Sequence, residues 1–97
     1  MRVEAVVDGV VVDGVEEWWD GVEAAAHRSP SQYPLLAAIS PYGAWRVPTE
    51  RLADLAEECT QLADGQASGT QAFLSRIADL TRRTIAGQFT ELRFNGD

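Results

Sequence analysis

Four side chains near the amino terminus have the types and the spacing of a metal site. They stand at positions i, i+4, i+7 and i+11: Glu16, Asp20, Glu23 and His27. On one helix this spacing places all four on a single face, where carboxylate and imidazole groups can ligate a divalent cation. The same spacing is common on solvated helices, and a histidine near a helix carboxyl end is explained more simply by the helix dipole. We therefore expect no metal ion and no cofactor.

The chain offers little equipment for covalent or nucleotide chemistry. It has one histidine and one cysteine, and all eight of its basic residues are arginines, so a lysine Schiff base and a Walker-type lysine are excluded. Cys59 falls on an apolar helix stripe, where a thiol acts as a small buried hydrophobe with a raised pKa. We predict that the protein has no catalytic residues and is not an enzyme. A carboxylate-only enzyme, which needs two acids in one cleft, is the weakest alternative.

Aromatic residues suggest binding rather than catalysis. Trp18 and Trp19 are adjacent, so on a helix their side chains diverge by about 100° and one of them lies at the edge of the core. Tyr42, Trp45 and Arg46 fall in a loop and are of the types enriched in binding hot spots, although Trp45 could equally fold back into the core. The predicted partner-binding residues are Glu16, Trp19, Asp20, Glu23, Tyr42, Trp45 and Arg46.

The negative charge is concentrated in the first quarter of the chain. Residues 1–27 hold seven acidic residues against one arginine, a net charge of −6, whereas residues 28–97 hold eight acidic residues and seven arginines, a net charge of −1. A field of this sign repels phosphate backbones and anionic lipid and attracts basic proteins. We expect a protein partner with a basic surface, and neither nucleic acid nor membrane as a partner.

The amino-terminal elements that must position these residues begin with a hairpin. Residues 6–15 are a tandem Val-Val-Asp-Gly-Val repeat, and Asp8-Gly9 between valine runs indicates a two-residue type I′ turn. This turn predicts the pairs Val7–Val10, Val6–Val11, Ala5–Val12 and Glu4–Asp13. Val6 and Val11 would then point away from the helices as an exposed apolar strip, through which a homodimer could form. Asp13 would end the strand or cap the next helix.

Hydrophobic periodicity predicts the remaining elements. They are an acidic amphipathic helix from Val15 to about His27, a helix or strand at Leu35–Ile39, a loop over 40–48, a helix capped by Thr49 and running to about Ala63, a helix from Ser68 or Thr70 to Gly87, and a strand at Phe89–Phe94. The predicted fold is α+β and forms one domain over residues 1–97. Its small, three-stranded antiparallel sheet, made of the N-terminal hairpin and the C-terminal strand, is packed on one side by three to four helices.

One segment carries a resemblance. Residues 35–43 read Leu-Leu-Ala-Ala-Ile-Ser-Pro-Tyr-Gly, and an amphipathic helix with Leu52, Leu55, Glu58 and Leu62 follows. This combination resembles an element of short uncharacterised bacterial proteins. The resemblance covers under a third of the chain and implies no activity and no site.

The expected function is a non-enzymatic protein–protein interaction module, such as an immunity-type inhibitor or an adaptor, whose acidic hairpin and first helix face a basic partner. The alternative is a small-molecule or peptide binding domain with a pocket walled by Trp18 or Trp19, Tyr42 and Trp45. No apolar run approaches a membrane span, and the amino terminus lacks a signal-peptide pattern, so we expect a cytoplasmic protein.

Overall fold

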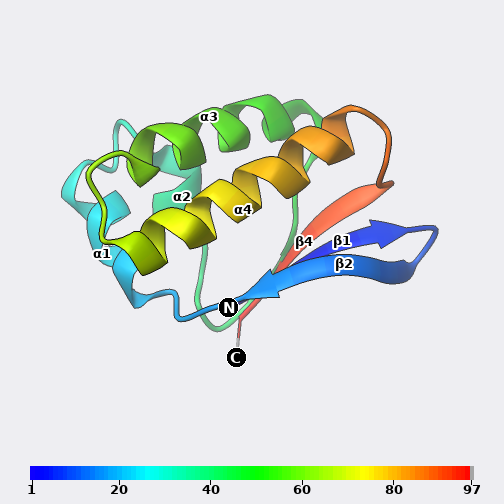
Figure 1. Cartoon of the computed structure of the whole chain (residues 1–97), viewed down its shortest axis with the longest axis horizontal. Helices are drawn as coiled ribbons and strands as arrows, with labels where there is room; N and C mark the ends of the chain where they lie inside the picture. The colour runs from blue at the N-terminus through cyan, green and yellow to red at the C-terminus, as the bar shows by residue number, and fades with distance from the viewer. Residues whose placement is uncertain (97) are drawn as a thin grey trace.

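The chain begins and ends in neighbouring strands of one antiparallel sheet, which helices cover on one face (Figure 1). The computed structural model describes residues 1–96. The strands are β1 (Arg2–Val7), β2 (Val10–Glu16), β3 (Ala44–Arg46) and β4 (Glu91–Asn95), in the order β2-β1-β4-β3. The helices are α1 (Asp20–Arg28), α2 (Pro34–Ala38), α3 (Leu52–Ala63) and α4 (Ser68–Ile85), and a short 3-10 turn, η1 (Thr49–Arg51), precedes α3. The predicted α+β class is confirmed.

The hairpin turn has the predicted geometry. Asp8 and Gly9 have φ angles of +50° and +84°, the positive values that a type I′ turn requires at both central positions. The observed register is Val7–Val10, Val6–Val11, Ala5–Asp13 and Glu4–Gly14. The first two predicted pairs are therefore confirmed, and the next two are wrong because Val12 is the extra residue of a β-bulge.

The bulge turns Asp13 toward the helices. Its carboxylate accepts hydrogen bonds from Arg76 at 2.8 Å and from Arg83 at 3.3 Å, both on α4. The backbone N–H of Gly14, together with Arg76, holds the pKa of Asp13 below its usual value. In the predicted register Asp13 would have stood opposite Glu4, and like charges in that position are destabilising. Asp13 thus neither ends the strand nor caps a helix; it fastens the hairpin to α4.

The outer face of the sheet is polar rather than bare. Val6 is completely buried, so the predicted exposed strip through Val6 and Val11 is wrong, although Val11 itself is 47% exposed. Charged and amide side chains cover this face, with contacts Arg2–Glu16 at 3.7 Å, Arg46–Glu91 at 3.9 Å, Arg93–Glu91 at 3.2 Å, and Asn95 donating to Glu4. The exposed apolar side chains of the hairpin lie near its tip instead, at Val10, Val11 and Val12.

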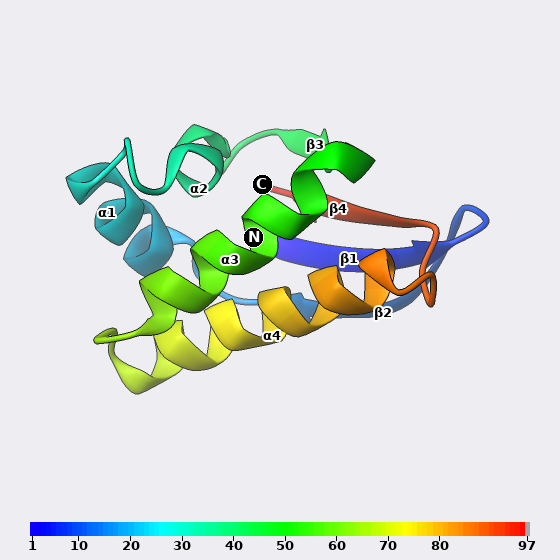
Figure 2. The ribbon, with the colours of Figure 1, turned by 90° about the horizontal axis from the view of Figure 1, so that it is seen from above.

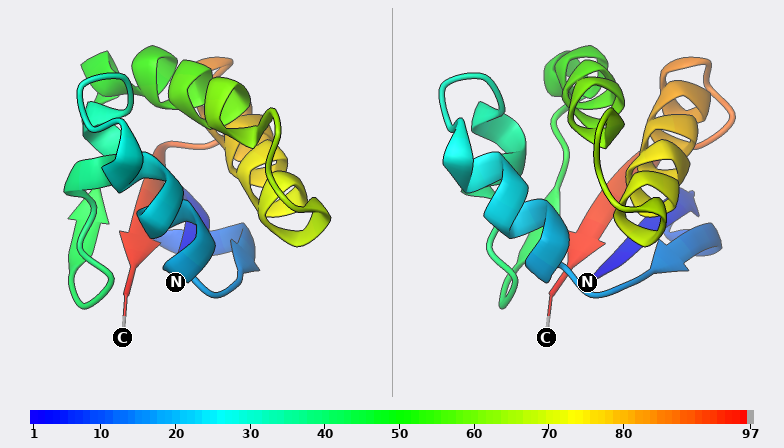
Figure 3. Two further views of the ribbon diagram at one scale, coloured as in Figure 1. Left: turned by 90° about the vertical axis from the view of Figure 1, so that its left-hand side faces the viewer. Right: turned by 60° about the vertical axis from the view of Figure 1, so that its left-hand side comes forward.

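The first helix is shorter than predicted because strand pairing competes with it. Val15 and Glu16 pair with Val3 and Arg2 in the sheet, so β2 continues through positions that have helical periodicity. Helix α1 consequently begins at Asp20 rather than at Val15. Figure 3 shows the amino terminus and the end of β4 beside the start of this helix.

Residues 34–38 form a helix, which resolves the helix-or-strand alternative for Leu35–Ile39. The carboxylate of Glu58, on α3, accepts hydrogen bonds from the backbone N–H groups of Leu35 and Leu36, each at 3.1 Å. Glu58 is only 7% exposed, and burial raises its pKa even though these two bonds favour the ionised form. It thereby joins α2 to α3, the two parts of the segment that carries the resemblance.

Helices α3 and α4 lie side by side over the sheet, and α1 and α2 lie beyond its end (Figure 2). Their apolar faces and the inner face of the sheet form the core, whose fully buried members include Leu55, Cys59, Leu74, Ile77 and Leu92. The predicted burial of Cys59 is confirmed, and desolvation raises the pKa of its thiol to about 12. The predicted Thr49 side-chain cap is wrong: the 3-10 turn at 49–51 starts the helix without one.

The predicted loop over 40–48 contains the fourth strand. Residues 44–46 of β3 pair with β4, with Trp45 opposite Phe94. This strand is short, and its sequence does not alternate between apolar and polar residues. Its conformation is therefore set by pairing with β4. Across residues 1–96, no helix combines the length and the apolar character needed to cross a membrane.

Candidate functional site

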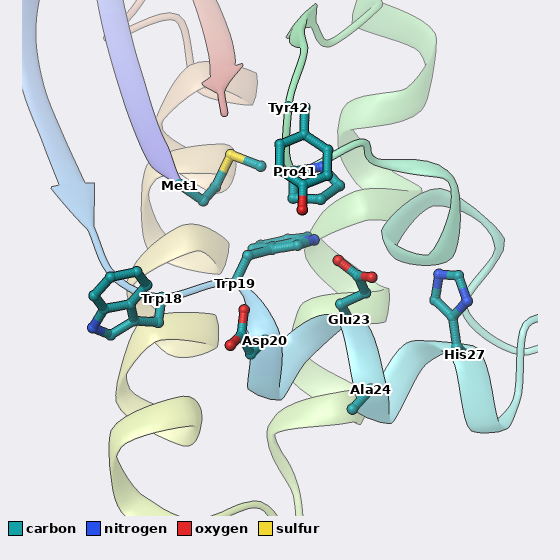
Figure 4. A pocket seen from close by; sticks show the side chains of 9 residues that line it. All are labelled: Met1, Trp18, Trp19, Asp20, Glu23, Ala24, His27, Pro41 and Tyr42. Atoms are coloured by element: carbon teal, nitrogen blue, oxygen red, sulfur yellow. The ribbon is translucent and has the colours of Figure 1, made fainter. Parts of the chain in front are cut away.

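An open cleft of about 480 Å³ lies where α1, the loop before β3 and the amino terminus meet (Figure 4). Its lining residues are Met1, Trp18, Trp19, Asp20, Glu23, Ala24, His27, Pro41 and Tyr42. Three of the nine are aromatic and two are acidic. Trp18 lies at one end and His27 at the other, with the acidic side chains between them.

One wall of the cleft is a single face of α1. Its members are spaced i, i+3, i+4 and i+7: Asp20, Glu23, Ala24 and His27. The start of the helix is pressed against α4, since a Cβ added at Gly21 would lie 2.6 Å from the Thr70 hydroxyl oxygen. Glycine at position 21 therefore permits the approach that orients this wall.

The opposite wall is the loop of Pro41 and Tyr42, which the end of the chain holds in place. The Gly96 N–H donates to the Gly43 carbonyl oxygen at 2.7 Å. A Cβ at Gly96 would lie 2.1 Å from the Pro41 carbonyl oxygen, so only glycine allows this contact. Tyr42 is 82% exposed and its ring projects over the cleft (Figure 4).

Trp19 forms the floor. It is 3% exposed, and its ring makes edge contacts with Phe73 and Phe94, with centroids 6.1 Å apart in both pairs. Among the described residues, its Nε1 is the one buried side-chain nitrogen or oxygen without a hydrogen-bond partner. An unsatisfied buried donor costs about 1–3 kcal/mol. Trp19 Nε1 is therefore a hydrogen-bond donor of the cleft floor that still needs an acceptor.

The cleft is acidic. Asp20 is exposed and Glu23 is half-buried, and both stand in the first turn of α1, where carboxylates also interact favourably with the helix dipole. Neither forms an ion pair within residues 1–96. None of the nine lining residues is an arginine. The two carboxylates are thus available to a cation from outside the chain.

The basic groups at the cleft are engaged elsewhere. The Met1 ammonium donates to the Glu17 carbonyl oxygen at 3.0 Å. His27 Nε2 donates to the Ala37 carbonyl oxygen at 3.0 Å, a contact that ties α1 to α2 and places the proton on Nε2, because a carbonyl can only accept. His27 is therefore a structural contact as well as part of the rim.

The structure brings four of the predicted partner-binding residues together and separates the other three. Trp19, Asp20, Glu23 and Tyr42 all line the cleft. Glu16 lies on the outer face of the sheet, 3.7 Å from Arg2. The helix face shared by Glu16, Asp20, Glu23 and His27 does not exist, because Glu16 belongs to β2. Over residues 1–96, no group of three or more histidine, cysteine or carboxylate residues could hold a metal ion.

Trp45 and Arg46 lie away from the cleft. Trp45 is half-buried and packs against Phe94, with ring centroids 5.8 Å apart, so it serves the core and lines no wall of the cleft. Arg46 is exposed beside Glu91 on the outer face. Because β3 alternates its side chains between the two faces of the sheet, these neighbours in sequence end on opposite sides.

Sequence reasoning missed Met1, Ala24 and Pro41 as lining residues, and it considered His27 as a metal ligand or as a partner of the helix dipole but not as part of a cleft. The spacing of Ala24 and His27 from Asp20 was a usable signal, because i+4 and i+7 fall on the same helix face. For Met1 and Pro41 no local pattern exists, since tertiary packing alone brings them to α1.

Comparisons with protein-family models, curated proteins and solved structures give no match, so the function is argued from the geometry of the cleft.

Proposed function

We propose that the protein is a non-enzymatic binding module that docks a basic segment of a partner protein on the cleft. The observation that carries this proposal is the combination of two unpaired carboxylates, Asp20 and Glu23, with the exposed rings of Trp18 and Tyr42, which are 79% and 82% exposed. Cationic side chains are attracted both to carboxylates and to aromatic faces. The unsatisfied Nε1 of Trp19 marks the same cleft independently of the acidic groups.

The distribution of charge supports the same reading. Seven of the nine lining residues belong to residues 1–27, the part of the chain that carries a net charge of −6 of the total of −7. Such a field accelerates encounter with basic partners and disfavours acidic ones. An immunity-type inhibitor of a basic protein, or an adaptor for one, is the finer class that we propose.

The shape of the cleft favours a partner's side chains over an enclosed small molecule. Its volume of about 480 Å³ is within the range of ligand pockets, but Trp18 and Tyr42 are mostly exposed, and Trp45 does not wall it. Asp20 and Glu23 lie one helical turn apart in a cleft that is open to solvent, whereas catalytic groups usually act in a site from which water is excluded. Both features support binding over catalysis.

Selection from a displayed peptide library tests the proposal. The wild-type protein should enrich peptides rich in arginine or lysine, and the Asp20→Asn/Glu23→Gln double variant should lose that enrichment. The matched control is Glu50→Gln/Asp64→Asn, which removes the same charge from two exposed positions outside the cleft and should behave like wild type. Enrichment of neutral or acidic peptides, or unchanged selection of basic ones by the cleft variant, would contradict the proposal.

A further inference from the structure

Trp19 carries a hydrogen-bond donor for which the described chain supplies no acceptor. Only 3% of Trp19 is exposed, and its Nε1 has no hydrogen-bond partner. Buried indole N–H groups normally find an acceptor. The missing acceptor is a feature of the cleft floor that the acidic residues do not explain.

The ring cannot turn to satisfy this donor elsewhere. Phe73 and Phe94 contact it at interplanar angles of 89° and 74°, so the core fixes its orientation. Figure 4 shows the nitrogen end of the ring between the side chains of Tyr42 and Glu23. The donor is therefore aimed into the cleft, at the place where a ligand would meet the carboxylates.

On the basis of the proposed function, we propose that the cleft binds an arginine residue of an extended peptide at two points. Its guanidinium group pairs with Asp20 and Glu23 and stacks on the exposed ring of Trp18 or Tyr42. A main-chain carbonyl oxygen of the same peptide accepts the hydrogen bond of Trp19 Nε1. Arginine is favoured over lysine because its planar guanidinium group both stacks on aromatic rings and pairs with carboxylates through several N–H groups.

Tyr42 controls access to the donor. The hydroxyl end of its side chain points toward the nitrogen of Trp19 in Figure 4, while the side chain itself is 82% exposed. An exposed side chain changes rotamer rapidly and at little cost, so the ring swings aside when the peptide carbonyl enters. The two-point contact thus distinguishes an arginine within a peptide from a free cation.

The indole N–H resonances of the ¹⁵N-labelled protein report this contact directly. The chain has three tryptophans, and Trp18→Phe and Trp45→Phe variants assign their resonances by removing one each. The probes are acetyl-Gly-Arg-Gly-amide, the same peptide with citrulline in place of arginine, and ethylguanidinium, which has the cation but no carbonyl.

We expect the arginine peptide to move the Trp19 indole resonance downfield and to slow the exchange of its proton with solvent. Ethylguanidinium should shift the backbone amides of Asp20 and Glu23 and leave the Trp19 indole in place. The Asp20→Asn/Glu23→Gln variant should bind the arginine peptide about tenfold more weakly or worse, whereas Glu50→Gln/Asp64→Asn should match wild type.

Three results would overturn the inference. In the first, the arginine peptide binds but shifts the Trp19 indole resonance no more than ethylguanidinium does. This result would show that the carbonyl contact does not form, and it would not contradict the proposed function. Equal binding of the citrulline peptide removes the role of charge and counts against the proposed function as well. Faster solvent exchange of the Trp19 indole proton in free Glu23→Gln would show that Glu23 is its acceptor, which again overturns only the inference.

Discussion

Three buried or half-buried polar residues differ in how the fold satisfies them. Glu58 accepts hydrogen bonds from two backbone N–H groups at the start of α2, and Asp13 accepts hydrogen bonds from two arginine side chains of α4. Trp19 finds no acceptor. The first two groups are explained by structure alone, because each joins two elements. Only the third leaves a hydrogen-bond donor for the ligand that we propose.

Glu58 makes stability depend on pH in a definite direction. Because its pKa is raised in the folded state, its contribution is fully present below the unfolded value of 4.5 and is lost as pH rises through the folded pKa. We expect the free energy of unfolding of the wild type, minus that of Glu58→Gln, to be largest below pH 4.5 and to fall above it. Urea denaturation of both proteins from pH 4 to pH 7 measures this difference. A difference that grows with pH would show that the fold stabilises the ionised carboxylate instead.

Cys59 tests the packing of the core. It is fully buried with a thiol pKa of about 12, so we expect no reaction of the native protein with a thiol reagent at neutral pH. Cys59→Ala should lose about 1 kcal/mol or more of stability through lost packing, and peptide binding should be retained. Rapid labelling of the native thiol would mean that α3 opens locally. Urea titration gives the stability change.

At the scale of elements, Gly14 allows the two strands of the hairpin to approach each other closely. A Cβ at Gly14 would lie 2.9 Å from the Val3 carbonyl oxygen, which is backbone and cannot move aside cheaply. Gly14 directly follows Asp13, the residue that the bulge turns toward α4. The close approach of β1 and β2 at this point keeps the ion pairs of Asp13 in place.

We therefore expect Gly14→Ala to destabilise the protein by about 1–3 kcal/mol, the usual cost of overpacking. Gly69→Ala is the matched control, because Gly69 lies in α4 with open space around it and alanine there should stabilise the helix by about 0.5–1 kcal/mol. Thermal and urea unfolding of the two variants provides the comparison. Equal effects of the same sign would show that the approach of β1 and β2 is unimportant.

At the scale of the whole molecule, the fold distributes four of the seven acidic residues of the first quarter over two different surfaces. Asp20 and Glu23 line the cleft, whereas Glu4 and Glu16 lie on the outer face of the sheet with Arg2 and Asn95 as partners. Of these four carboxylates, those of the cleft form no ion pair within residues 1–96. All acidic residues of the first quarter contribute to the long-range electrostatic field, whereas in the proposed complex only Asp20 and Glu23 contact the partner.

This division predicts how salt acts on binding. At physiological ionic strength charges are screened beyond about 8 Å, so raising the salt concentration should slow association of wild type with a selected basic peptide. Asp20→Asn/Glu23→Gln should have a slower rate and a flatter salt dependence, while Glu16→Gln should change the rate much less and leave dissociation unchanged. Stopped-flow fluorescence at low and high salt measures these rates. Wild-type kinetics in the Asp20→Asn/Glu23→Gln variant would show that these two acids are solvated surface residues with no role in association.

Local patterns were sufficient where a segment's own residues determine its conformation. The Asp8-Gly9 turn, the helices near residues 52–63 and 68–85 and the burial of Cys59 could all be predicted, because glycine's φ freedom and the helical repeat act within a few residues. The same reasoning predicted Trp19, Asp20, Glu23 and Tyr42 as binding residues. It brought Trp18 or Trp19 together with Tyr42 only in the alternative of a pocket that also included Trp45, which does not line the cleft.

Only the tertiary structure decided the bulge at Val12, the extension of β2 to Glu16, the strand β3 and the cleft itself. Each of the first three depends on a partner outside the segment itself: Arg76 and Arg83 for the bulge, β1 for β2, and β4 for β3. The sequence by itself determined an acidic α+β fold and left open whether its tryptophans lie in the core or at the surface. Whether those aromatics face the core or a shared cleft was settled by packing, because the contacts that orient them lie between elements rather than within them.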